Sequence, residues 1–371
     1  MKCFALVNPG LENITEKEVK EFLPSSKPKH LSLSVEFEVK KNEDLLLLAQ
    51  HLQSVKRICI SLGKYFSLDN LKLATFPWLD FFTNETSFKV EVENVSGQDN
   101  RFAMAKNVAG HIFSELEKVK MVPKMEMKKP NILVIVFYTG KEYLIGIDIC
   151  GRELNSRHYR VFPHPASFKG DLGYYFVRTS GFKLGEQILI GFAKDGVLAI
   201  EAALFQHQVP LKQLKEDSWH YFPSLVKLVE SSGVNSSEVI PKVKDLSESE
   251  NKISIFAFDQ SIQNTNASRK NAYLAGVKSH INLQKYSLED LDVKYDPNQF
   301  DRIILQVTSK DEDQLNEIYY QTNYVLKSKG TLLLLGRKGW DFSVSNKFKL
   351  LQSGEMVRGN SITAWWLLEK V

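Results

Sequence analysis

The pattern of hydrophobic and polar residues predicts two kinds of organisation along the 371-residue chain. At its start, an apolar strand over Lys2–Val7 ends in an Asn-Pro-Gly turn. The capping box Thr15-Glu-Lys-Glu18 is expected to open the helix that follows. Leu31–Val39 alternates apolar and polar residues, as a half-buried strand does. These elements predict a small ferredoxin-like module over residues 1–45.

Residues 46–150 follow a pattern of their own. The long helix Arg101–Lys120 has one apolar stripe, while its charged residues face elsewhere. The other elements expected here are a helix at Asp44–Leu52 and strands at Arg57–Leu62, Ser87–Val92, Ile132–Phe137 and Glu142–Asp148.

From Tyr174 to Val371, strands alternate with helices, which predicts a doubly wound parallel sheet. The expected strands are Gln187–Phe192, Ile253–Phe258, Asn282–Tyr286, Arg302–Val307 and Thr331–Gly336, and the expected helices are Gly196–Phe205, Asn264–Leu274 and Asp311–Lys327. Ser328-Lys-Gly330 is expected to end the last helix. The serine- and glutamate-rich stretch Ser232–Glu250 is interpreted as a mobile surface excursion.

Composition narrows the class of protein without changing this outline. A hydrophobic fraction of 43% is that of an ordinary globular chain, and its apolar runs are far shorter than the roughly 20 residues that span a bilayer. No secretory signal is apparent at the start, so a cytoplasmic protein is expected. Cys3, Cys59 and Cys150 are isolated and are expected to be buried, and no group of ligands has metal-binding spacing.

The net charge of +4 is small, but lysines are dense after the long helix. Such local density attracts a phosphate backbone. The alternative is a solvated lysine-rich helix end. The candidate RNA-binding residues of this region are Arg101, Lys106, Lys118, Lys120, Lys124, Lys128 and Lys129.

Residues 151–173 form a polar, basic and aromatic linker, in which Arg157 and Arg160 are further candidates for RNA contact. Arginine planes and aromatic rings hold phosphates and unstacked bases. An equally weighted alternative is a docking segment whose arginines pair with local carboxylates.

Three sequences carry a family resemblance: Asn8-Pro-Gly-Leu-Glu12, the linker stretch from Arg157 to Gly170, and Ile200-Glu-Ala-Ala203. With the order of modules, they make the chain similar to the THUMP-containing RNA guanine-N2 methyltransferases, particularly the archaeal members. The resemblance implies an α+β N-terminal part, ferredoxin-like plus THUMP (46–150), that grips structured RNA, usually tRNA. It further implies an α/β, Rossmann-like class I methyltransferase domain (174–371) that binds S-adenosylmethionine.

Carried over by this resemblance, the remnant cofactor site consists of His164, Lys169, Gly196, Glu201 and Asp259, with Asp259 in the position that meets the ribose. The family's loop of the Asp-Pro-Phe-Cys-Gly-Ser-Gly-Thr type reads here from Ile190 to Val197.

That loop departs from the family pattern at two important positions. Ile190 replaces a carboxylate, and Lys194 replaces a glycine and adds a positive charge near the place of a sulfonium cation. After the third strand, Lys285 or Tyr286 replaces the residue that reads the adenine. Each change is expected to weaken cofactor binding.

The fourth strand is expected to end in an Asn- or Asp-Pro-Pro-aromatic motif, which aims the guanine amine at the methyl group. This chain has Gln306-Val-Thr-Ser309, so Gln306 is the only catalytic candidate, at a degenerate position. The favoured hypothesis is a protein that binds RNA, in particular tRNA, and that neither binds a cofactor nor catalyses a reaction. It would serve as a scaffold or as the partner of an active subunit. The alternative is an active S-adenosylmethionine-dependent methyltransferase that uses Asp195, Asp259 and Gln306.

Overall fold

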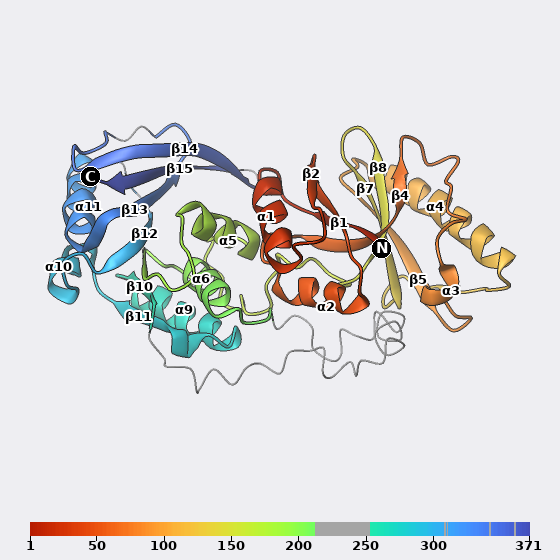
Figure 1. Cartoon of the computed structure of the whole chain (residues 1–371), viewed down its shortest axis with the longest axis horizontal. Helices are drawn as coiled ribbons and strands as arrows, with labels where there is room; N and C mark the ends of the chain where they lie inside the picture. Colours follow the sequence, from red (N-terminus) through yellow and green to blue (C-terminus); the bar gives the residue numbers. More distant parts are fainter. Residues whose placement is uncertain (212–252, 308, 310, 341–342, 360) are drawn as a thin grey trace. The chain divides into compact units, whose positions relative to one another are not determined.

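The computed structural model describes residues 1–211, 253–307, 309, 311–340, 343–359 and 361–371 (Figure 1). Within them the chain forms two compact units, residues 1–154 and the described residues from 155 onward. The expected excursion Ser232–Glu250 lies outside the described residues. Each unit is built around one sheet.

The first unit is an α+β structure. Its elements in chain order are β1 (Lys2–Leu6), α1 (Glu12–Phe22), β2 (Lys29–Leu31), β3 (Ser34–Glu38), α2 (Asn42–His51), β4 (Arg57–Tyr65), α3 (Trp78–Phe81), β5 (Ser87–Glu93), α4 (Gln98–Lys118), β6 (Lys124–Met125), β7 (Ile132–Tyr138) and β8 (Tyr143–Asp148). In its described residues the strand order is β2-β3-β1-β4-β8-β7-β5-β6. Because β1 pairs with both β3 and β4, one sheet continues across the expected module boundary at residue 45.

The first helix begins three residues before the expected capping box, at Glu12. Its carboxylate accepts hydrogen bonds from the backbone N–H groups of Gly10 (2.8 Å) and Leu33 (3.2 Å). Thr15 and Glu18 are buried inside the helix, where Glu18 accepts the backbone N–H of Gln53 at 2.8 Å. The capping-box prediction is therefore wrong, because these polar side chains bond to residues that follow α2 rather than to their own helix end.

The second unit has the strand order β11-β10-β9-β12-β13-β15-β14 among its described residues. The first five strands are parallel, and β15 runs antiparallel to β13 and β14. Its elements are α5 (Gly170–Thr179), β9 (Ile188–Gly191), α6 (Val197–His207), β10 (Ile255–Asp259), α9 (Ile262–Leu274), the 3-10 helices η2 (Lys278–His280) and η3 (Leu288–Asp290), β11 (Ile281–Lys285), α10 (Leu291–Lys294), β12 (Phe300–Gln306), α11 (Glu312–Val325), β13 (Leu326–Arg337), β14 (Phe348–Arg358) and β15 (Ser361–Lys370). The strand order reverses at β9, because β10 and β11 lie on one side of it and β12 and β13 on the other, so a ligand-binding crevice is expected at the carboxyl ends of β9 and its neighbours.

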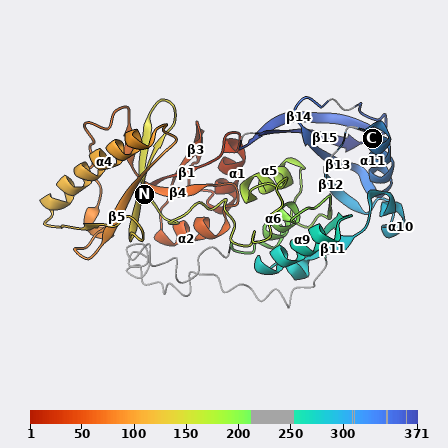
Figure 2. The same cartoon turned by 180° about the vertical axis from the view of Figure 1, so that it is seen from behind.

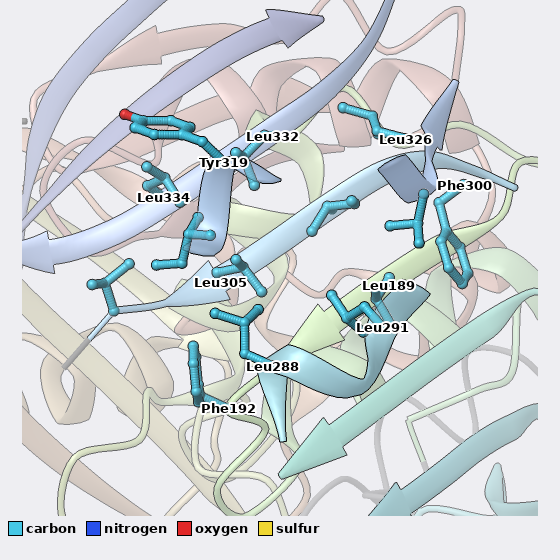
Figure 3. Packing of buried hydrophobic residues seen from close by; sticks show 14 of the residues in the cluster. Leu189, Phe192, Leu288, Leu291, Phe300, Leu305, Tyr319, Leu326, Leu332 and Leu334 are labelled. Atoms are coloured by element: carbon cyan, nitrogen blue, oxygen red, sulfur yellow. The ribbon is translucent and has the colours of Figure 1, made fainter. Parts of the chain in front are cut away.

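One hydrophobic cluster joins the second sheet to α10 and α11 (Figure 3). It contains Leu189, Leu305 and Leu334 from three strands, together with Leu291 and Tyr319 from the two helices. In Figures 1 and 2, α6 and α9 lie next to each other and apart from α11. This core therefore joins α10 and α11 to one face of the parallel strands. The helices α6 and α9 contact β10 and lie apart from α11.

Several elements of the second unit differ from the prediction. The helix α5 begins at Gly170, inside the expected linker, and the hairpin of β14 and β15 is additional. Ser328-Lys-Gly330 lies within β13 rather than at a helix end. The three cysteines are free and buried, as predicted.

Candidate functional site

The loop between β9 and α6 has the backbone of a glycine-rich loop with only one glycine. Phe192 and Lys194 have φ values of 55°, and Gly196 has a φ of 85°. L-residues with side chains adopt such left-handed conformations at a cost of about 1 kcal/mol or more. At Gly196 an added Cβ would lie 2.9 Å from Ser268, so this glycine is required both by backbone and by space. The other two positions carry strain.

Asp259 ends β10 and turns toward this loop. Its carboxylate accepts hydrogen bonds from the backbone N–H of Lys194 (2.9 Å), the backbone N–H of Ser261 (2.9 Å) and the side chain of Asn264 (3.1 Å). The side chain is buried. Asp259 therefore holds the loop in place through the backbone of Lys194.

The side chain of Lys194 spans the edge of the sheet. Its Nζ donates to Gln306 Oε1 at the end of β12 (2.8 Å) and to the carbonyl oxygen of Ala166 (3.2 Å). Burial and the neighbouring Arg358 lower the pKa of Lys194 to about 8, while Asp195 and Asp259 oppose this change. The amine of Lys194 thus connects the loop after β9 with the catalytic candidate Gln306, whose side chain is buried.

Asp195 is fully buried and holds the linker. It pairs with Arg160 (Nε to Oδ2, 3.0 Å), accepts the backbone N–H of His164 (3.1 Å) and bonds to the hydroxyl of Ser167. The ring of His164 accepts the backbone N–H of Ala166 at 3.1 Å. Arg160 and His164 are therefore parts of a folded segment that covers the loop.

A second buried ion pair lies behind the loop. Arg157 donates to both carboxylate oxygens of Glu201 (2.8 and 3.0 Å), and the hydroxyl of Tyr159 donates to the same carboxylate (2.6 Å). Neither charged side chain has exposed surface. Arg157 is thus out of reach of a phosphate. In this segment the arginines pair with local carboxylates, which is the second of the two interpretations of the linker.

Asn271 of α9 joins the linker to the loop. Its side chain accepts the backbone N–H of Phe162 (3.1 Å) and donates to the carbonyl oxygens of Phe162 (3.0 Å) and Asp195 (2.9 Å). It is completely buried. The sequence pattern alone does not point to Asn271, because a polar residue in a helix gives no sign of its partners.

Aromatic side chains fill the carboxyl ends of the neighbouring strands. Phe192 packs on Phe258 with ring centroids 5.8 Å apart, and Phe258 stacks on Tyr286 at 4.7 Å. Phe192 and Tyr286 are buried in the same hydrophobic cluster, where Figure 3 labels Phe192 beside Leu288. Tyr286, rather than the exposed Lys285, is the residue after β11 that packs against the edge.

The lysine-rich segment lies in the first unit, after α4. Lys124 and Met125 form β6, which pairs with the first two residues of β5. All seven cationic candidates of this unit are exposed: Arg101, Lys106, Lys118, Lys120, Lys124, Lys128 and Lys129. Arg101 also lines a groove of about 570 Å³, whose lining includes Lys89 and Phe102 as well as the acidic side chains of Glu91, Glu93 and Glu153. The lysine-rich segment is thus exposed and cationic, while the groove beside Arg101 has mixed charge.

Lys169, the last of the predicted cofactor-site residues, is exposed and lies directly before α5. Among the described residues, no group of three or more potential metal ligands gathers, and no helix is long and apolar enough to cross a membrane.

The strand order of the second unit, with helices that connect its parallel strands, is that of a class I methyltransferase fold. Residues 157–322 match the UPF0020 family, described as the RMKL-like methyltransferase domain. This match confirms the resemblance for the methyltransferase domain.

Sequence relatives carry names of the same class. A tRNA (guanine(6)-N2)-methyltransferase of Methanocaldococcus jannaschii is 23% identical over 301 residues, covering 76% of this chain and 74% of the relative. Its namesake in Archaeoglobus fulgidus is 25% identical over 240 residues, covering 62% and 61%.

Solved structures extend the fold to the whole chain. TrmN from Thermus thermophilus has a TM-score of 0.68 and 18% identity, covering 100% of this chain and 99% of that one. A possible methylase from Clostridium difficile 630 has a TM-score of 0.75 and 16% identity, covering 100% and 98%. The chain therefore combines an N-terminal α+β part with a Rossmann-like methyltransferase domain, as predicted.

Proposed function

We propose that this protein binds structured RNA, in particular tRNA, through a THUMP-type N-terminal part. We further propose that its methyltransferase domain no longer transfers methyl groups. The observation that carries the second half is the hydrogen bond between Lys194 Nζ and Gln306 Oε1. It places an amine of the chain itself between the loop that would hold the cofactor and the position that would aim the target base.

The residues at this edge do not fit S-adenosylmethionine. A sulfonium cation is repelled by Lys194 and by Arg358, and Arg358 is close enough to Lys194 to contribute, after burial, to the lowered pKa of Lys194. Ile190 offers no carboxylate, and Asp259 already accepts three hydrogen bonds from its own chain. Phe192 and Tyr286 are buried where a planar ligand would lie against the strand ends.

RNA binding is supported by the exposed cations of the first unit and by the relatives. The segment from 117 to 129 carries five lysines and two glutamates, and its lysines are all exposed. The relatives' names refer to tRNA. Lysines on a short edge strand also discourage edge-to-edge pairing, so an RNA-binding measurement has to separate these roles.

The second candidate is an active S-adenosylmethionine-dependent RNA guanine-N2 methyltransferase. Asp259 at the end of β10 favours it, since an acidic residue there suits ribose hydroxyls. In that case Lys194 has to leave Gln306 when the cofactor binds.

One set of measurements tests the proposal. The wild-type protein is expected to shift a tRNA transcript in a gel, with an affinity that falls steeply with salt. Replacing Lys124, Lys128 and Lys129 with glutamate should abolish most of this binding. The matched control reverses three exposed lysines elsewhere in the unit, Lys17, Lys20 and Lys41, and should bind nearly as well as wild type.

Calorimetry with S-adenosylmethionine tests the inactive site. No binding is expected below about 1 mM. Micromolar affinity, or transfer of a labelled methyl group to tRNA, would select the active enzyme instead. An unchanged gel shift in the triple variant would remove the lysine segment from RNA binding.

A further inference from the structure

The outer end of α9 carries an open groove that the proposed function does not use. The groove measures about 320 Å³ and is lined by Phe162, Arg269, Lys270, Tyr273, Leu274 and Lys278. An adjoining hollow of about 710 Å³ shares Tyr273, Leu274 and Lys278. Tyr273 is 70% exposed, so its ring is accessible from the groove.

The charge of this groove has one sign. Three of its lining residues are cationic, and neither hollow has an aspartate or glutamate among the lining residues that the structure describes. Lys270 Nζ lies 4.7 Å from the centroid of the Phe162 ring, so its ammonium is already positioned on an aromatic face. Arg269 is held by a hydrogen bond of 2.9 Å to the carbonyl oxygen of Leu283. The site thus has fixed cations beside an exposed ring.

The groove is separate from the edge that holds Lys194. The helix α9 starts at Ile262, close after β10, and Tyr273 lies at its opposite end. Between them Asn271 fixes the backbone of Phe162 through two hydrogen bonds. The shape of the groove therefore depends on the linker and α9, and none of its lining residues belongs to the loop between β9 and α6.

We propose that this groove binds an unpaired nucleotide of the RNA, with its base stacked on Tyr273 and its phosphates beside Lys270 and Lys278. An aromatic face accepts any base, and cations at its rim suit the backbone on either side. The inference rests on the proposed RNA-binding function and adds a second contact, on the methyltransferase domain. It gives that domain a role in holding RNA that needs no methyl transfer.

Two variants test the site with a 12-nucleotide oligouridylate and with a tRNA transcript. Tyr273→Ala is expected to weaken oligouridylate binding about tenfold, as loss of one stacked base does. Lys270→Ala with Lys278→Ala should reduce the slope of log affinity against log salt by about 1.4, because two phosphate contacts are lost. Matched controls on α10 and α11 are Lys294→Ala and Tyr320→Ala, whose side chains are also exposed.

The outcomes separate this inference from the proposed function. If the groove variants bind both RNAs within about twofold of wild type, while the lysine variant of the first unit loses tRNA, the groove is overturned and the RNA-binding function stands. If wild type binds neither RNA, the proposed function fails, and the groove fails with it. Binding of oligoglutamate as tight as that of oligouridylate would instead assign the surface to an acidic protein. Circular dichroism of each variant confirms that it is folded.

Discussion

At the scale of single residues, Lys194 combines two features that rarely occur together. Its backbone is in the left-handed region, and its side chain is half-buried with hydrogen bonds to Gln306 and Ala166. A residue with a side chain is strained in this backbone conformation, and the conformation persists only because neighbouring residues stabilise it. Asp259 supplies that restraint by accepting the backbone N–H of Lys194.

Lys194→Gly is therefore expected to strengthen binding of S-adenosylmethionine at least tenfold from its weak starting value, because the change removes a cation and opens space. Calorimetry measures this. Lys329→Gly is the matched control, since Lys329 has a φ of 59° and is exposed in β13. It should relieve the same backbone strain without affecting the cofactor. Equal and weak binding by both variants would show that Lys194 does not exclude the ligand.

At the scale of elements, the segment from Asn155 to Lys169 is held to the methyltransferase domain by side chains of two helices. Glu201 of α6 binds Arg157, and Asn271 of α9 binds the backbone of Phe162. Gly170 is required at the end of the segment, because an added Cβ would lie 2.3 Å from Arg157 Nε. The segment thus behaves as a fixed cover of the domain.

Asn271→Ala should release this cover. The variant leaves two part-buried backbone groups of Phe162 and the buried carbonyl oxygen of Asp195 without this partner, which costs about 2–4 kcal/mol. Hydrogen exchange of residues 158–168, followed by mass spectrometry, should become faster by a factor of about 30 or more. Asn266→Ala, at an exposed position of the same helix, is the control and should leave exchange unchanged. Unchanged protection in Asn271→Ala would mean that other contacts hold the segment.

Sequence patterns predicted elements well where one face is buried. The alternation of β5 and the apolar runs of β7 and β9 all appear as strands. Patterns failed where the signal is weak. The hairpin strand β14 is largely exposed, and α5 contains Gly170 and Gly173, which read as linker. Both glycines are needed for close packing against Arg157 and Val197, a tertiary reason that a local pattern does not show.

The candidate site was predictable in its positions but not in its contacts. The family resemblance, together with the expected strands, placed Asp259, Gly196 and Gln306 at neighbouring strand ends. The bond between Lys194 and Gln306 joins residues 112 positions apart, and no local property reveals it. The same holds for Arg157, whose charge suggested a phosphate and whose partner is Glu201.

At the scale of the whole molecule, a pair of stacked histidines, one buried and one partly buried, makes stability depend on pH. His207 and His280 stack at 4.0 Å, and burial lowers the pKa of both, that of His207 to about 4, with repulsion from His280 as the second cause. The folded state therefore favours the neutral rings. Their contribution to stability is complete above the ordinary value of 6.5 and is lost as the pH falls from there toward about 4.

His207→Phe should make this loss smaller. Phenylalanine keeps a stacked ring, and His207 Nε2 has no hydrogen-bond partner among the described residues, so little else is removed. The decrease in melting temperature from about pH 7.5 to about pH 5 should be smaller than in wild type. Burial raises the pKa of Asp148 to about 6, which acts in the opposite direction. Its effect cancels in the difference between the two proteins, and an identical decrease in both would contradict the assignment.

The left-handed loop between β9 and α6 also bears on how proteins of this fold are compared. Its path is kept by its surroundings: Gly191 is enclosed by Leu305 and Phe258, and the backbone at Lys194 is tied to Asp259. The main-chain path of this loop therefore says little about what the loop can bind. The informative positions are those with positive φ, Phe192 and Lys194, because a side chain in place of glycine there changes the space beside the loop and leaves its backbone path unchanged.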